Sequence, residues 1–451
     1  MQDNKLKIAE QTLDMTKGNI LSTLVVFSLP VLIGQVFQQF YNIADTAIIG
    51  NFLGEVSVAA VGATSAIYSM LVGFAVGVSN GFGVFIARYF GAGDEEKLRK
   101  TVHMSLWLGL GIALILTLIS MAGLKPLLVW VNTPPEILPE SLSYLRVIAM
   151  GTIVTMLYNL LAAMLRSLGN SRMPLYFLIV STVINIVLDI VFIRVFSLGV
   201  VGTAYATVFS QAVSVVLCIL YIWKKVPLLY ICKKYFVRDL RMCKDLLSLS
   251  LSMAFMLVIT KFGNVVFQWY VNEMGIQTIT GHTAARKIHE MLTLTIDAIS
   301  VAVATFISQN FGAREYDRIK KGIRISIFIG WGWGILATII VFVFGIPLSK
   351  FLTGTQSKEV LDIAMLYLVT NVPCYFMLTL LLIYRNAMQS LGYKILPIIV
   401  SGIELAGKIL PLGVLTGWWG YLGVCVLEPV LWTICSAVLI VGYMYAKEKW
   451  K

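Results

Sequence analysis

Apolar runs of about 20 residues recur along almost the whole chain, and this is the length that crosses roughly 30 Å of hydrocarbon. Of the 451 residues, 58% are hydrophobic and only 13% are charged, whereas charged residues approach a quarter of a soluble protein. Barrel strands would instead alternate in segments of about ten residues. The sequence therefore predicts an all-α integral membrane protein with twelve transmembrane helices at 20–49, 56–87, 102–124, 140–165, 173–196, 200–222, 246–272, 281–308, 325–346, 360–384, 394–415 and 419–445.

The formal net charge of +12 would suggest a nucleic-acid partner in a soluble protein. Here most of the basic residues follow even-numbered spans, as in the segments 88–100, 224–244 and 314–324. Basic residues are enriched in cytoplasmic loops. We therefore expect a multi-pass protein of the inner (plasma) membrane with both termini in the cytoplasm, no cleavable signal peptide and no nucleic-acid partner.

The two halves of the chain resemble each other. "FIARYFGAGDEEKLRKTV" at 85–102 resembles "FISQNFGAREYDRIKKGI" at 306–323, and "MLRSLGNSRMP" at 164–174 resembles "AMQSLGYKILP" at 387–397. All four segments follow even-numbered spans, so the halves run in the same direction through the membrane. This predicts an amino-terminal six-helix lobe (1–222), a basic cytoplasmic linker (223–245) and a carboxy-terminal six-helix lobe (246–451). Two such lobes can expose a midplane cavity alternately to each side.

Polar residues recur at helical spacing in three spans of the amino-terminal half. They are Gln38, Tyr41 and Asp45 in the first span, Asn185 and Asp189 in the fifth, and Thr203 and Thr207 in the sixth. Residues three or four apart share one face of a helix, so the three faces are expected to converge. Pro30 offers a bend point in the first span, because proline removes a helical hydrogen bond.

The two aspartates have no basic residue nearby in these spans. Burial and like charge both disfavour the ionised form, so such a site binds a cation or holds a proton. The sequence thus predicts coupling to H⁺, or to Na⁺ held by Asp45, Asn185, Asp189 and Thr207, with no other cofactor or metal. The alternative for the threonines is a hydrogen-bonded network that only joins helices.

The carboxy-terminal half does not repeat this pattern. It carries Lys261, Asp297, Glu404 and Lys408 within predicted spans, and Glu428 beside Pro429. Glu404 and Lys408 can pair at i,i+4, and Lys261 can pair with Asp297. The predicted lining of a substrate cavity comprises Gln38, Tyr41, Asn159, Gln211, Lys261, Asp297, Glu404 and Lys408.

Enzymatic motifs are not found. His282 and His289 lie outside any HExxH pattern, and no P-loop is present. No GxSxG elbow follows a strand. The six cysteines form no CxxC pair, so we expect neither disulfides nor a metal centre. We predict that the chain is not an enzyme.

Several segments resemble the multidrug and toxic compound extrusion (MATE) family. They are "FSLPVLIGQVFQQFYNIADTAIIGNFLGEVSVAAVG" at 27–62, "GVSNGFGVFIARYFGAGD" at 77–94, "AMLRSLGNSRMP" at 163–174 and "NIVLDIVFI" at 185–193. The resemblance covers nearly the whole chain, and its motifs are specific through their order and spacing. It implies a twelve-helix, two-lobe antiporter that exports organic cations in exchange for H⁺ or Na⁺.

The resemblance is closest to the DinF-like branch of this family. There a first-span Asp, a fifth-span Asn and Asp, and a sixth-span Thr are associated with coupling, and they match Asp45, Asn185, Asp189 and Thr207. The carboxy-lobe acids of the NorM-like branch do not match Asp297 or Glu404 cleanly. Lys261 and Lys408 match no family position.

The favoured function is therefore a monomeric secondary antiporter that exports cationic or lipophilic organic compounds, with membrane lipid as its surroundings. One alternative is a flippase for lipid-linked precursors or polysaccharides, which needs a strongly cationic cavity. Lys261 and Lys408 favour this alternative, and the acids of the amino-terminal half oppose it. Another is a non-transporting scaffold or receptor, which gives no reason for duplicated lobes.

Overall fold

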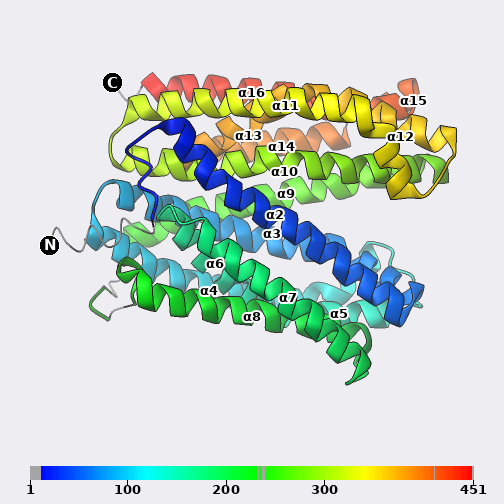
Figure 1. Ribbon diagram of the computed structural model, residues 1–451, viewed down its shortest axis with the longest axis horizontal. Coiled ribbons are helices and arrows are strands. Elements are labelled where there is room, and N and C mark those ends of the chain that lie inside the picture. The colour runs from blue at the N-terminus through cyan, green and yellow to red at the C-terminus, as the bar shows by residue number, and fades with distance from the viewer. Residues whose placement is uncertain (1–11, 232, 236–238, 411, 449–451) are drawn as a thin grey trace. The chain divides into compact units, whose positions relative to one another are not determined.

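The computed structural model describes residues 12–231, 233–235, 239–410 and 412–448, and all the regular elements in these ranges are helices (Figure 1). The first half contains α2 (Ile20–Leu53), α3 (Glu55–Gly91), α4 (Glu95–Trp130), α5 (Leu138–Met150), α6 (Thr152–Ser167), α7 (Arg172–Arg194), α8 (Gly199–Lys225), η1 (Pro227–Leu229) and η2 (Lys233–Tyr235). The second half contains α9 (Leu240–Asn272), α10 (Ile276–Gly312), α11 (Tyr316–Thr353), α12 (Lys358–Asn371), η3 (Val372–Cys374), α13 (Tyr375–Ser390), α14 (Ile395–Ile409), α15 (Leu412–Trp419) and α16 (Tyr421–Glu448).

Among the described residues, 10 spans are long and apolar enough to cross a membrane, and α5 with α6 makes up to 11. The predicted span 140–165 is this pair, which bends by 46° between Met150 and Thr152. At the bend, a Cβ on Gly151 would overlap the side chain of Val208. Glycine therefore allows α8 to approach the bend. The predicted span 394–415 falls on α14 and α15, and residue 411 between them lies outside the described residues.

Asp94 marks the start of α4. Its side chain accepts a hydrogen bond from the Lys97 backbone N–H at 3.0 Å, which satisfies one of the free donors at a helix N-terminus. The hydrogen bond from the Lys97 side chain is the main reason why the pKa of Asp94 lies below its ordinary value, and the backbone bond adds to it. This cap thus fixes the point at which α4 begins in the basic segment that follows α3.

The chain forms two compact units. Unit 1 comprises Leu29–Val258 and the segment up to Met15, and unit 2 comprises Thr16–Ser28 and the chain from Ile259 onward. The helices α2 and α9 therefore contribute residues to both units. Pro30 lies inside α2, which is continuous from Ile20 to Leu53. Its role as a bend point stays a prediction.

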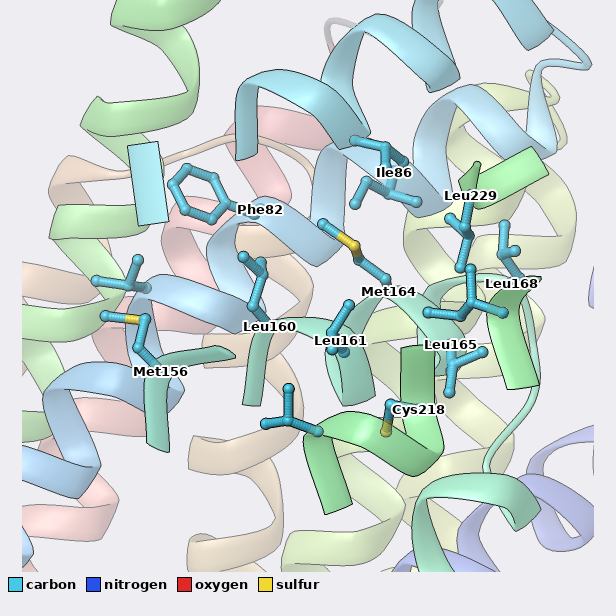
Figure 2. Close-up of a cluster of buried hydrophobic side chains, with 14 of the residues drawn as sticks. Phe82, Ile86, Met156, Leu160, Leu161, Met164, Leu165, Leu168, Cys218 and Leu229 are labelled. Atoms are coloured by element: carbon cyan, nitrogen blue, oxygen red, sulfur yellow. The ribbon is translucent and has the colours of Figure 1, made fainter. Parts of the chain in front are cut away.

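In unit 1, α3 packs against α4, α5 and α6, and α8 packs against α5, α6 and α7. Figure 2 shows the centre of this packing, where Leu160, Leu161, Met164 and Leu165 of α6 are surrounded by side chains such as Phe82 of α3 and Cys218 of α8. Gly77 and Gly81 bring α3 against the backbone of α9 at Ala254 and Ser250. Close approach at small residues is a common way for helices to pack in membranes.

In unit 2, α10 packs against α11, α12 and α13, and α16 packs against α12, α13, α14 and α15. Phe267 and Val271 of α9 join Val424, Leu427 and Leu431 of α16 in a buried apolar cluster. This core packs α9 against α16, the helix that carries Glu428.

Candidate functional site

The carboxyl groups of Asp45 on α2 and Asp189 on α7 lie within hydrogen-bonding distance of each other in unit 1. Asp189 is fully buried, with 0% of its surface exposed, and Asp45 is half-buried. A hydrogen bond between two carboxyl groups requires one of them to carry a proton, because an ionised carboxylate only accepts. The predicted meeting of the two aspartates is therefore present in the structure.

Asn185 connects Asp189 to α8. With its amide nitrogen toward Asp189, Asn185 donates to Asp189 Oδ2 at 3.1 Å, and its oxygen accepts from the Thr207 backbone N–H at 3.2 Å. The orientation of the amide follows from this network, since it satisfies both neighbours. The hydroxyls of Tyr41 and Thr207 are 2.9 Å apart. The cluster thus joins α2, α7 and α8.

Two oxygens of the cluster lack a donor. Asp45 Oδ1 and Asp189 Oδ1 are buried and accept no hydrogen bond from the described residues other than what the two carboxyl groups offer each other. No ion pair reaches either aspartate in the same part of the chain. Buried carboxylates without partners are costly. The arrangement therefore suits a proton or a small cation.

Tyr68 on α3 and Tyr144 on α5 lie near enough to the aspartates to interact with them through their charge. Both interact electrostatically with Asp45, and Tyr144 also interacts with Asp189. Sequence reasoning did not select them, because a lone tyrosine in an apolar span is a common packing residue. Tyr144 lies in the predicted span 140–165, but its helical face gave no signal of its own.

The other predicted residues of the amino-terminal half lie apart from this cluster of hydrogen bonds. Thr203 is buried and donates to the Val200 carbonyl of its own helix at 2.9 Å. Asn159 donates to the Thr155 carbonyl at 2.8 Å, and the Thr155 hydroxyl donates to Gln211 Oε1 at 2.6 Å. Gln38 is exposed.

A buried network of charged side chains lies in unit 2. Arg286 Nη1 on α10 lies 3.1 Å from Glu428 Oε1 on α16, and Arg385 Nη2 on α13 lies 2.8 Å from Glu404 Oε2 on α14. Lys408 Nζ lies 3.8 Å from Glu404 and 3.7 Å from Glu428. The predicted pairing of Glu404 with Lys408 is therefore present as one part of a larger network.

Polar groups surround this network. Tyr367 donates to Glu428 Oε2 at 2.5 Å, and Lys408 donates to Asn264 at 2.9 Å. His282 Nδ1 lies 2.9 Å from the Tyr421 hydroxyl, and His289 Nδ1 lies 3.1 Å from the Tyr375 hydroxyl. The network and its polar neighbours connect α9, α10, α12, α14 and α16. They also include α13, through Arg385 and Tyr375.

Arg286 and Arg385 were missed by sequence reasoning. Arg286 lies inside the predicted span 281–308, where an intramembrane charge is itself a signal of function. Arg385 lies one residue beyond the predicted span 360–384, where basic residues are common at the ends of transmembrane helices.

Lys261 and Asp297 interact electrostatically, but no ion pair joins them in the described chain. Lys261 is exposed and Asp297 is half-buried. The five described cysteines, Cys218, Cys243, Cys374, Cys425 and Cys435, are free, and Cys232 lies outside the described residues.

Replacing Thr207 by valine should lower the free energy of unfolding by about 0.5–1.5 kcal/mol, because it removes the hydroxyl that joins α2 to α8. Thr203→Val is the matched control. It lies one turn away and its hydroxyl bonds only within α8. Thermal unfolding in detergent measures both. Equal losses in the two variants would contradict a role for the Tyr41–Thr207 contact.

Comparison with known proteins places this geometry in a family. The MatE family model matches residues 30–191 and 252–415, once in each half. The chain is 28% identical to the probable multidrug resistance protein YoeA of Bacillus subtilis, covering 95% of this chain and 94% of the relative. It is 22% identical to the multidrug export protein MepA of Staphylococcus aureus, covering 96% of each.

Solved structures agree with the fold. A MATE crystal structure in the bent conformation superposes with a TM-score of 0.86 at 20% identity, covering 97% of this chain and 96% of that chain. Both halves match one family model, the relatives span nearly full length, and the fold is shared. The chain therefore belongs to the MatE family of membrane transporters, the multidrug and toxic compound extrusion proteins.

Proposed function

We propose that this protein is a secondary antiporter that exports cationic or lipophilic organic compounds in exchange for H⁺ or Na⁺. The observation that carries the proposal is the buried pair of Asp45 and Asp189, whose Oδ1 atoms have no donor from the rest of the described chain. Intramembrane acids without a basic partner are typical of ion pathways in transporters. The names of the relatives, which speak of multidrug resistance and multidrug export, support organic compounds as the cargo.

For H⁺, the two carboxyl groups act as a single unit. One shared proton allows them to remain within hydrogen-bonding distance, and a second proton neutralises both. Loss of the shared proton leaves two negative charges side by side, which then repel each other. Since Asp45 lies on α2 and Asp189 on α7, proton loading and release would change how these helices pack.

For Na⁺, the cluster offers the oxygen ligands that hard cations prefer. The two Oδ1 atoms would bind first. The Asn185 oxygen and the Thr207 hydroxyl would have to give up their present partners, the Thr207 backbone N–H and the Tyr41 hydroxyl. No three His, Cys, Asp or Glu side chains of the described residues form a group that could hold a metal, so a sodium site would need these neutral ligands.

Coupling follows if ion and cargo favour different states. A ligand shifts a conformational equilibrium only by its difference in affinity between the states. In the proposed cycle, the ion enters from outside, α2 rearranges near Pro30 and the cargo is released. The two lobes, 1–222 and 246–451, which are joined by 223–245, would then return to the inward-facing state. Both termini would lie in the cytoplasm.

Proteoliposomes with independently imposed gradients test this proposal. The pH gradient and the Na⁺ gradient are applied one at a time, and we expect one of them to drive transport of a cationic dye. The gradient that does so identifies the coupling ion. Liposomes without protein, and protein with a collapsed gradient, are the controls. Dye transport that is unaffected by both gradients would refute the antiporter mechanism.

The flippase alternative retains one supporting observation, the cation-rich network in unit 2. A pyrophosphate carries more negative charge than the single surplus positive charge of this network. The amino-terminal carboxyl pair would also repel it. Accessibility of a labelled lipid headgroup in the same proteoliposomes separates this alternative from dye export.

A further inference from the structure

We propose that unit 2 contains a binding site for a single carboxylate group of the exported compound, formed around Arg286. This inference rests on the proposed export function and specifies its cargo. The compounds bound best would then carry one negative group in addition to their lipophilic or cationic part. The argument uses the charge count, the burial and the free donors of the network in unit 2.

The network has a surplus of one positive charge. Its direct contacts join three cations, Arg286, Arg385 and Lys408, to two carboxylates, Glu404 and Glu428. Neutral histidines leave this surplus unchanged, and protonated ones would increase it. On α10, Glu290 also interacts electrostatically with Arg286, and both Glu290 and the oppositely charged Lys287 are exposed to solvent.

The surplus is located in a buried environment. The exposed fractions are 3% for Lys408, 4% for Glu428, 5% for Arg385 and 7% for Glu404. An uncompensated buried charge is costly, whereas a paired one is tolerated. One bound carboxylate would bring the charge of the whole network to zero, while a phosphate dianion or pyrophosphate would overshoot.

Arg286 has donors to offer to such a group. All the hydrogen bonds that Arg286 makes with the described residues come from Nη1. This atom donates to the Tyr367 hydroxyl and to the two carboxylate oxygens of Glu428. Its side chain keeps 18% of its surface exposed, in contrast to 6% for Arg385. A guanidinium group binds a carboxylate through two parallel N–H groups, so the free edge of Arg286 is suited to this role.

A buried donor on Arg385 also favours a negatively charged ligand. Arg385 Nε is buried and has no hydrogen-bond partner in the described part of the chain. Native proteins satisfy most buried donors. Arg286 provides the accessible contact, and Arg385 and Lys408 provide the surrounding positive potential.

Equilibrium binding to the purified protein in nanodiscs, with no ion gradient, tests the inference. The probes are a rhodamine dye with a free carboxylate and the same dye as its ethyl ester, measured by fluorescence anisotropy. We expect the carboxylate form to bind about tenfold more tightly, equivalent to about 1.4 kcal/mol. In Arg286→Gln the two forms should bind equally, and in Arg286→Lys the preference should persist.

The double variant Lys320→Gln with Asp317→Asn is the charge-matched control, because this exposed ion pair on α11 lies outside the network. It removes one cation and one anion, so it keeps both the surplus and Arg286, and should keep the preference. If Arg286→Gln does not yield folded protein, Lys408→Gln alone also removes one positive charge and should weaken the preference.

Two results would overturn the inference. They are equal binding of acid and ester by the unaltered protein, and a preference that persists unchanged in Arg286→Gln. Because binding is measured without a gradient, failure of ion-driven transport would refute the proposed function and leave this preference measurable. Conversely, transport of both dyes without preferential binding would refute only the carboxylate site.

Discussion

Asp189→Asn is expected to reduce gradient-driven export by about 100-fold or more, close to the background of empty liposomes. Coupling between two ligands typically corresponds to about 1–3 kcal/mol, or up to about 150-fold, and this substitution removes the group that would carry it. Asparagine has nearly the same size as aspartate, but it neither ionises nor shares a proton with Asp45. The Asn185 contact to position 189 can persist, because the amide oxygen of asparagine also accepts.

The same loss is expected for Asp45→Asn, since the two carboxyl groups act as a pair. Asp362→Asn is the matched control, because Asp362 is exposed on α12 and has no ion pair among the described residues. Initial rates of dye transport under an imposed gradient, normalised to inserted protein, provide the comparison. Full activity of Asp45→Asn or Asp189→Asn would show that the pair does not couple export to an ion.

Arg385→Met should lower the free energy of unfolding of unit 2 by about 3–5 kcal/mol, the typical cost of breaking a buried ion pair by removing one partner. Arg385 and Glu404 are 2.8 Å apart, and both side chains are at most 10% exposed. Methionine fills similar space but leaves Glu404 with only Lys408, at 3.8 Å. Thermal unfolding in detergent, followed by the intrinsic tryptophan signal, measures the loss.

The double variant Arg385→Met with Glu404→Met separates the ion pair from simple packing. Removing both partners of a buried pair is often neutral or stabilising, so the double variant should recover most of the lost stability. If the double variant unfolds as early as Arg385→Met, the loss comes from packing around α13 and α14 rather than from the broken Arg385–Glu404 pair.

The helical content and the repeat were predicted from the sequence because they depend on composition and periodicity. A run of apolar residues can satisfy its backbone in lipid only as a helix, and α3, α7 and α8 follow their predicted spans closely, whereas α4 and α11 extend beyond theirs at both ends. The bend between α5 and α6 was not predicted, and the contact of Val208 with Gly151 at the bend comes from another helix that the local sequence does not place.

The amino-terminal cluster was also within reach of the sequence. Asn185 and Asp189 lie four residues apart, so their helix already determines that they face the same direction. The lack of a nearby basic residue then indicated that this face meets a proton, a cation or another polar group. Thr203 shows the limit of this reasoning, since it has the same spacing as Thr207 but bonds within its own helix.

The sequence by itself determined which residues form helices, that the two halves repeat, and which side of α7 carries Asn185 and Asp189, because each of these follows from local periodicity. Only the tertiary structure decided that Asp45 meets Asp189, that Tyr68 and Tyr144 lie near them, and that Arg286, Arg385 and Lys408 share two glutamates. Helical periodicity determines the face of a helix on which a side chain lies. Which faces then meet depends on the side-chain packing of helices that are far apart in the sequence.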